Sequence, residues 1–280
     1  MSFLKAQIPF SSARQAILYI SCLILSLMIN LPVQAQSQSE LIKKLDFSQP
    51  VEIFAINKDG DFILKSGQTL RSAELNLPST QDCDRLAQVC SITKKIRDYY
   101  TQNLVGRTVM IDQSTIFSDR YNRLHAHIQI SGENWLQYTL LSLGLARVET
   151  LHPSPLTTPF LLAAEATARE QKVGIWSLKA FEPLSVDIPK SKMDRFQIIE
   201  GTIQETADVK GVIYLNFGDN WREDFTIKLP ADIRRKFVDK GQSLLGLKDH
   251  RIRIRGWLFW ENGPMISLYH PEQLEILTPQ

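Results

Sequence analysis

Hydrophobic and polar residues alternate in three short stretches that begin near residue 50. The stretches are VEIFAI, FILK and TLRSAEL, and they are separated by the turn NKDGD and by Ser66-Gly67. Alternation with a period of two, bounded by Gly-containing turns, is typical of strands joined as hairpins. A helical pattern then covers residues 86–104, and the strands RTVMID and RLHAHIQI follow it. Three strands, a helix and two further strands are the order of elements in an OB barrel.

The same order of elements returns in the second half of the chain, after two further helical patterns. These helices read from WLQYTLLSLG, which Gly144 ends, and from TPFLLAAEATAREQKVG. The stretches FQIIEGTIQE, GVIYLNFG and DFTIKL then read as strands, PADIRRKFVDKG as a helix, and HRIRIRGWLFW and PMISLYH as closing strands. We therefore predict an α+β protein, mainly β with helices, that contains two OB-like five-stranded barrels.

The first 35 residues have the composition of a removable export signal. Lys5 and Arg14 are their only charges, residues 16–31 are mostly apolar, and LPVQA ends in the small-residue pattern of a signal-peptidase site. We predict cleavage after Ala35 and a periplasmic or secreted protein with no stable membrane insertion afterwards. The alternative is an uncleaved membrane anchor, which the short and polar-interrupted apolar run disfavours.

Polar or aperiodic stretches set the remaining boundaries. The predicted parts are a signal peptide (1–35), a linker (36–49), a first domain (50–180), a linker (181–194) and a second domain (195–280). The second linker contains FEPLSVDIPKSK, which has two prolines and no period. The chain has 32 basic and 30 acidic residues, and two of the basic ones lie in the signal. The mature protein is therefore neutral, so nucleic acid would have to bind at a local basic patch.

Cys83 and Cys90 are the only cysteines outside the signal. In an exported protein such a pair reads first as a disulfide, with two unpaired thiols as the alternative. Seven residues along one unbroken helix rise about 10 Å, which is too far for a bridge. The disulfide therefore requires Cys83 to lie in the loop before the helix.

Four pieces of sequence occur in an order that carries a family resemblance. They are DGD (residues 59–61), LRSAELNLPS, DRYNRLHAHI and LLAAEATAREQKVGIWS. With them, residues 51–177 resemble the staphylococcal nuclease-like (thermonuclease) domain, and the cysteine pair resembles that of a secreted subgroup. The resemblance implies an OB barrel that cleaves phosphodiesters with a calcium ion, two arginines, two aspartates and a glutamate.

The match of individual residues to the family's site is uneven. Arg71 and Arg123 match the two arginines that neutralise the phosphate, for which the guanidinium fork is suited. Arg120 and Tyr121 match positions that contact the nucleotide, and Asp61 matches the first metal-binding aspartate. The resemblance thus implies nucleic acid, either DNA or RNA, as the partner of the first domain.

Two residues depart from the family's pattern. Asn76 stands where the second metal-binding aspartate is expected, and it offers calcium a carbonyl oxygen without a negative charge. Ser79 replaces the glutamate and is a poor base near neutral pH without an activating partner. Three nearby carboxylates are open as substitutes: Glu74, Asp82 and Asp84. Whether the protein is an enzyme is therefore open, although its family is one of phosphodiester endonucleases.

These observations predict an exported thermonuclease-like protein that contacts nucleic-acid phosphates, with weak or lost calcium-dependent hydrolysis. The alternative is a non-catalytic nucleic-acid-binding, ligand-binding or envelope interaction protein that uses the OB fold. His125 and His127 lie two residues apart and share a strand face with Arg123, which raises the possibility of a metal site.

The second domain contains one basic motif, RIRIR. Alternation places Arg251, Arg253 and Arg255 on one face, with Trp257 continuing that face and the intervening isoleucines turned inward. Basic residues beside an aromatic on an OB barrel can bind single-stranded nucleic acid. The alternative is that these arginines pair with acidic residues of their own domain.

Overall fold

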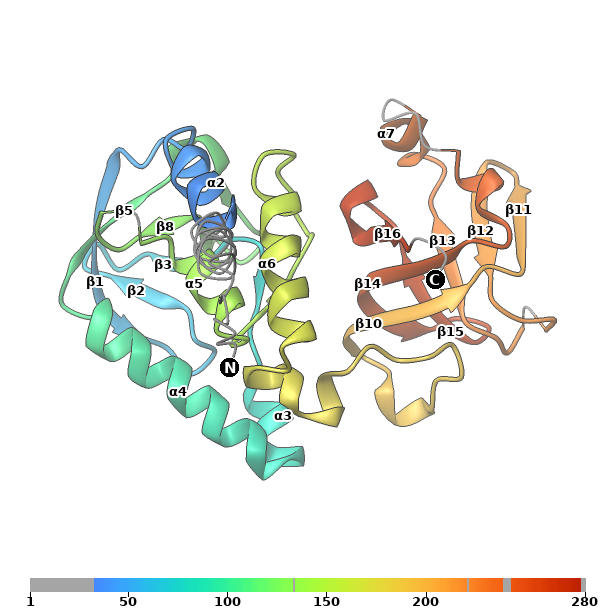
Figure 1. Ribbon diagram of the computed structural model, residues 1–280, viewed down its shortest axis with the longest axis horizontal. Coiled ribbons are helices and arrows are strands. Elements are labelled where there is room, and N and C mark those ends of the chain that lie inside the picture. The colour runs from blue at the N-terminus through green and yellow to red at the C-terminus, as the bar shows by residue number, and fades with distance from the viewer. Residues whose placement is uncertain (1–32, 133, 221, 239–242, 278–280) are drawn as a thin grey trace, which may run out of the picture. The chain divides into compact units, whose positions relative to one another are not determined.

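The computed structural model describes residues 33–132, 134–220, 222–238 and 243–277 (Figure 1). The chain divides into two units, Met1–Lys44 and Leu45–Gln280. In the first unit the described residues form helix α2 (Val33–Ile42), so the predicted linker begins in a helix and the predicted cleavage site after Ala35 falls within it. The signal peptide otherwise lies outside the described residues. Among the helices that are described, none is long and apolar enough to cross a membrane.

The first domain is built on a seven-stranded sheet in the order β6-β7-β3-β2-β1-β5-β8. Its strands are β1 (Gln49–Ile56), β2 (Phe62–Leu64), β3 (Thr69–Ser72), β5 (Thr108–Ile111), β6 (Phe117–Ser118), β7 (Leu124–Ala126) and β8 (Ile128–Gln129). Strands β3 and β7 are parallel, and β7 and β8 are separated only by His127. The path of strand pairings therefore returns to its beginning, as expected of an OB-like barrel.

Helices and a small second sheet complete this domain. The helices are α3 (Thr80–Arg85), α4 (Ala87–Asn103), α5 (Leu136–Ser142) and α6 (Thr158–Glu170), and β4 (Leu75–Asn76) pairs with β9 (Arg147–Val148). Helix α4 buries Val89, Ile92, Ile96 and Tyr100, whose spacing of three or four residues places them on one face. Gly144 follows α5 with φ 62°, and a Cβ atom there would lie 2.3 Å from the carbonyl oxygen of Val173. The predicted glycine stop is therefore required by backbone conformation and by close packing.

The second domain has a mixed sheet in the order β10-β14-β15-β13-β12-β11, with β16 paired to β14. Its elements are β10 (Arg195–Thr202), β11 (Glu205–Val209), β12 (Val212–Asn216), β13 (Thr226–Leu229), α7 (Arg234–Val238), β14 (Arg251–Trp260), β15 (Pro264–Ser267) and β16 (Leu274–Ile276). Strands β13 and β15 are parallel, which matches the β3–β7 pair of the first domain. The mixed α+β class is confirmed, and the closed second barrel stays a prediction.

The predicted linker 181–194 packs as part of the second domain. Leu184 forms a bridge with Ile199 of β10, and Ile188 is buried in the hydrophobic core of that sheet. Leu184, Val186 and Ile188 alternate with polar residues, which is a strand-like pattern. The stretch between Pro183 and Pro189 is therefore packed against the second sheet.

A buried ionic cluster joins helix α6 of the first domain to β14. Arg255 is 1% exposed and donates to Glu165 at 3.0 Å, to Glu275 at 2.7 Å and to the carbonyl of Val148 at 3.2 Å. Glu165 is itself fully buried and also accepts from Arg169 at 3.0 Å. Glu165 of α6 is thus linked through Arg255 of β14 to Glu275 of β16.

The arginines of RIRIR are therefore engaged within the protein. Arg251 and Arg253 pair with Glu200, and Arg253 also pairs with Glu275. Ile252 and Ile254 are fully buried, as the alternation predicted. The hypothesis that the arginine face binds single-stranded nucleic acid was wrong, because the domain's own carboxylates, together with Glu165 of the first domain, take up these charges.

Candidate nucleic-acid interface

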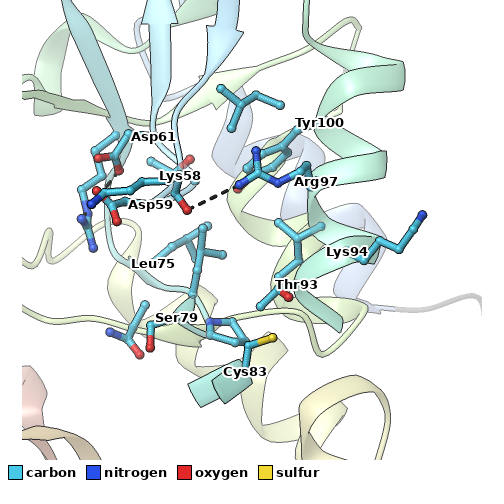
Figure 2. Close-up of a pocket in the computed structure, with 18 of the residues that line it drawn as sticks. Lys58, Asp59, Asp61, Leu75, Ser79, Cys83, Thr93, Lys94, Arg97 and Tyr100 are labelled. Atoms are coloured by element: carbon cyan, nitrogen blue, oxygen red, sulfur yellow. Dashed lines mark hydrogen bonds and ion pairs between the residues drawn. The ribbon is translucent and has the colours of Figure 1, made fainter. Parts of the chain in front are cut away.

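A cavity of about 520 Å³ opens between the β1–β2 turn, strand β3 and helix α4 (Figure 2). Asp59 and Asp61 come from the turn, and Thr93 and Arg97 come from the facing side of α4. Arg97 donates to the carbonyl of Lys58 at 3.4 Å, which fixes the turn against the helix. The cavity is thus walled by elements that are far apart in sequence.

Arg71 and Arg123 meet at one carboxylate in this cavity. Nη1 of Arg71 lies 3.6 Å from Oδ1 of Asp61, and Nη1 of Arg123 lies 3.4 Å from Oδ2. The parallel pairing of β3 with β7 places Arg71 opposite His125, two residues after Arg123. The side chain of Asp61 is 4% exposed, whereas those of the two arginines are 26% and 27% exposed. The two guanidinium groups are therefore partly exposed to solvent, while the carboxylate that they share is buried.

A second carboxylate fixes the orientation of Arg123. Nη2 and Nε of Arg123 lie 2.7 and 2.8 Å from Oδ2 of Asp119, and Nε2 of His125 lies 3.0 Å from the same oxygen. Burial acts to raise the pKa of Asp119, but the hydrogen bonds from His125 and Arg123 outweigh it and lower that pKa well below its usual range. Asp119 is thus an ionised anchor that holds the Arg123 fork.

The two histidines serve separate carboxylates. His125 contacts Asp119, and burial is the main reason that its pKa is lowered. His127 is 1% exposed and its Nε2 lies 3.0 Å from Oε2 of Glu74. Among the described residues no group of three His, Cys, Asp or Glu side chains is arranged to hold a metal ion. The histidines are therefore structural partners of buried acids rather than a metal pair.

Tyr121 and Arg120 stand at the exposed edge of the site. Tyr121 is 63% exposed, and the guanidinium groups of Arg120 and Arg123 lie 4.8 and 5.2 Å from the centre of its ring. Nη2 of Arg120 also donates to the Tyr121 hydroxyl at 2.7 Å. An exposed ring held between two cations is suited to stacking with a flat ligand group beside a phosphate.

The residues that would have to hold calcium do not fit the ion. Both carboxylate oxygens of Asp61 face arginines, as described above. The side-chain oxygen of Asn76 accepts a hydrogen bond from Nη2 of Arg147 at 2.7 Å. Calcium needs several hard, preferably anionic oxygens, and here a guanidinium cation occupies the side of Asn76 where the ion would have to bind. The predicted pair of metal ligands, Asp61 and Asn76, is therefore unsuited to calcium in this arrangement.

Ser79 is a helix cap. It precedes α3, and its Oγ accepts from the backbone N–H of Asp82 at 3.1 Å, while the Asp82 carboxylate accepts from the Ser79 N–H at 2.9 Å. This reciprocal capping box explains a serine at the position of the family's glutamate. Asp82 is occupied by the same box. Glu74 is buried against His127, Thr157 and Thr158 and does not reach the cavity.

The disulfide Cys83–Cys90 forms, with a Cα–Cα separation of 4.6 Å. Cys83 lies in α3 rather than in a loop, so that part of the prediction was wrong. Leu86, with φ −143° and ψ 105°, interrupts the helical path between α3 and α4 and brings the two cysteines together. Both cysteines line the cavity close to Ser79. The bridge therefore holds the capped helix against α4 at one end of the site.

Two charged residues of strand β9 and its end were missed by the sequence reasoning. Arg147 is 7% exposed and bonds Asn76, and burial lowers its pKa to about 10. Glu149 is half-buried; burial raises its pKa, and the charges of Arg71, Arg147 and Arg123 oppose that rise. Glu149 is thus a carboxylate near both phosphate-facing arginines. Reading ARVE as a strand paired with LN would have placed Arg147 and Glu149 on one face.

Comparison with known families identifies the class of the first domain. Residues 69–178 match the model of the family described as staphylococcal nuclease homologue. No curated protein matches the chain. The chain therefore contains a staphylococcal nuclease-like domain, which associates it with nucleic-acid binding or nuclease-type chemistry. The resemblance predicted over residues 51–177 is confirmed for residues 69–177.

Proposed function

We propose that this protein is an exported nucleic-acid-binding protein of the thermonuclease type whose calcium-dependent phosphodiester hydrolysis is weak or lost. The observation that carries the proposal is the convergence of Arg71 and Arg123 on Asp61, beside an Asn76 already bonded to Arg147. The arrangement keeps the groups that bind a phosphate and disables those that would bind the metal ion.

The arginine pair supports phosphate binding. Its contacts to Asp61 are 3.4 and 3.6 Å, longer than the 2.7–2.9 Å typical of a tight charge-assisted bond. A phosphate group can therefore compete for the exposed donors while Asp61 and Asp119 keep both forks in place. Tyr121 is placed to stack on an adjoining base.

The candidate bases for activating a water are engaged in other contacts, which supports the proposal that hydrolysis is weak. Ser79 and Asp82 are committed to the helix cap, and Glu74 is buried with hydroxyl and imidazole partners. Loss of a general base typically costs a factor of about 10²–10⁴ in rate. Asp59 lines the same cavity, and Glu149 is a further carboxylate near the arginines whose pKa is raised by burial.

Binding and cleavage assays on the mature protein test this function. Fluorescence anisotropy with labelled DNA and RNA is expected to give the same affinity in calcium and in chelator, because the carboxylates do not assemble a calcium site. Arg71→Gln and Arg123→Gln should each weaken binding at least about tenfold. Arg107→Gln is the matched control, since the Arg107 side chain is exposed and donates to the Gln102 carbonyl. Equal binding by all three variants would reject the site.

Rebuilding the acids tests the loss of hydrolysis. Asn76→Asp with Ser79→Glu should raise calcium-dependent cleavage at least about tenfold. The new aspartate would lie against Arg147, so adding Arg147→Gln should raise cleavage further. Removing the Ser79 cap costs about 1 kcal/mol of stability, and thermal unfolding must be measured alongside. Brisk cleavage by the unaltered protein in calcium would show that another carboxylate is the base.

A further inference from the structure

A second cavity adjoins the arginine site. It has a volume of about 530 Å³ and shares three lining residues with the first cavity, namely Asn76, Leu77 and Ser79. Its far wall comes from residues 190–197 and from Trp257 of β14. The two cavities therefore adjoin at Asn76, Leu77 and Ser79.

The lining of the second cavity is basic. Arg147, Lys190, Lys192 and Arg195 contribute four cations, and Asp82 and Asp194 contribute two acids. Asp82 is already committed to the cap of α3. Among the described residues, no carboxylate forms an ion pair with any of these four cations. Four cations against two acids leave the lining of this cavity with an excess of positive charge, although Asp82, Glu165 and Glu149 act electrostatically on Arg147.

Arg147 gives this charge a buried component. It is 7% exposed, donates to the Asn76 oxygen and to the carbonyl of Phe196, and lies 4.9 Å from the Phe196 ring centre. Its Nε is buried without a hydrogen-bond partner. A guanidinium held by two neutral oxygens in a buried position favours an anion nearby.

An exposed aromatic residue completes the second cavity. Trp257 is 59% exposed on the cavity wall. Trp260 lies on the same strand an odd number of residues away, and its ring centre is 4.8 Å from Nζ of Lys190, one of the cavity's cations. Exposed aromatics beside unpaired cations are how proteins bind single strands, with the bases stacked and the phosphates neutralised.

We infer that the second cavity is a subsite for single-stranded nucleic acid, in which phosphates of the strand leaving the arginine site meet Lys192 and Arg195 and a base stacks on Trp257. The inference rests on the proposed function, because the strand must first bind at Arg71 and Arg123. It differs from the rejected RIRIR surface, whose arginines are already paired. A single strand is favoured over a duplex because stacking on Trp257 requires an unpaired base.

Oligonucleotide length separates the two cavities experimentally. The probes are a single-stranded trinucleotide, which fits the first cavity, and a single strand of about eight nucleotides, which reaches the second. Trp257→Ala in the mature protein should weaken binding of the longer strand roughly tenfold and leave the trinucleotide unchanged. Phe54→Ala is the control and should change neither, because Phe54 is 68% exposed on β1 and lines neither cavity. Because both side chains are exposed, folding should be preserved, which circular dichroism checks.

Salt dependence tests the cations independently. Each phosphate contact with a single strand contributes about 0.7 to the slope of log affinity against log salt. The double variant Lys192→Gln with Arg195→Gln removes two such contacts, so the slope for the longer strand should become shallower by about 1.4. The slope for the trinucleotide should stay the same.

The outcomes distinguish the two proposals. If the trinucleotide does not bind, or binds independently of Arg123, the proposed function fails. If the trinucleotide binds but the longer strand is no tighter, or Trp257→Ala acts no differently from Phe54→Ala, the second subsite is overturned while the first stands. Equal weakening of duplex and single strand by Trp257→Ala would also overturn it.

Discussion

Replacing Arg255 by methionine is expected to destabilise the protein by about 3 kcal/mol. Arg255 is 1% exposed and its guanidinium contacts Glu165, Glu275 and the Val148 carbonyl. Removing one partner of a buried ion pair typically costs about 3–5 kcal/mol, because the other charge is left buried. The lower end applies here because Glu165 keeps Arg169 at 3.0 Å and the backbone N–H of Val148 at 2.6 Å.

Urea unfolding followed by tryptophan fluorescence measures this loss, and Arg251→Met is the matched control. Arg251 lies on the same strand and the same face, but its side chain is 48% exposed and its partner Glu200 is 21% exposed. A partly exposed pair of this kind contributes about 0–1 kcal/mol. The control should therefore shift the midpoint little, while Arg255→Met shifts it strongly.

A second variant tests the cause. Combining Arg255→Met with Glu165→Leu removes both buried charges and should cost less than the sum of the two single changes. If Arg255→Met costs no more than Arg251→Met, or if the two losses at Arg255 and Glu165 simply add, then the buried cluster does not stabilise the contact between the two domains.

Three further predictions follow from the site. Thiol titration of denatured, unreduced protein comprising residues 36–280 should find Cys83 and Cys90 bridged, and two free thiols would contradict the disulfide. Burial lowers the pKa of His125, so the unfolded chain takes up this proton first and stability should fall as the pH drops below about 6.5; His125→Gln should flatten this fall, and an unchanged urea-midpoint profile would refute it. Burial raises the pKa of Glu149, so the stability that its protonated form contributes is lost as the pH rises through that pKa. Above neutral pH, Glu149→Gln should therefore unfold at a higher urea concentration than the unaltered protein, whereas in acid the two urea midpoints should be equal.

The sequence by itself determined the elements and the class of the first domain. Alternation correctly predicted that Ile252 and Ile254 are buried, and the helical pattern over residues 86–104 correctly predicted α4. Such patterns are readable because the period of burial is set by the local backbone geometry of a strand or helix. The Ser79–Asp82 capping box is equally local, because its two residues are three positions apart in the sequence.

Only the tertiary structure decided which charges remain free. Asn76 meets Arg147 from 71 residues away, and Arg255 meets Glu165 from 90 residues away. The alternation of RIRIR is the same whether its arginines face nucleic acid or carboxylates. The choice depends on which distant strands the fold brings within about 3 Å and on how far that contact is removed from water, since burial sets the strength of an ionic interaction. Hydrophobic period carries no information about either quantity, so the partners of the site's charged residues emerge only once the chain is folded.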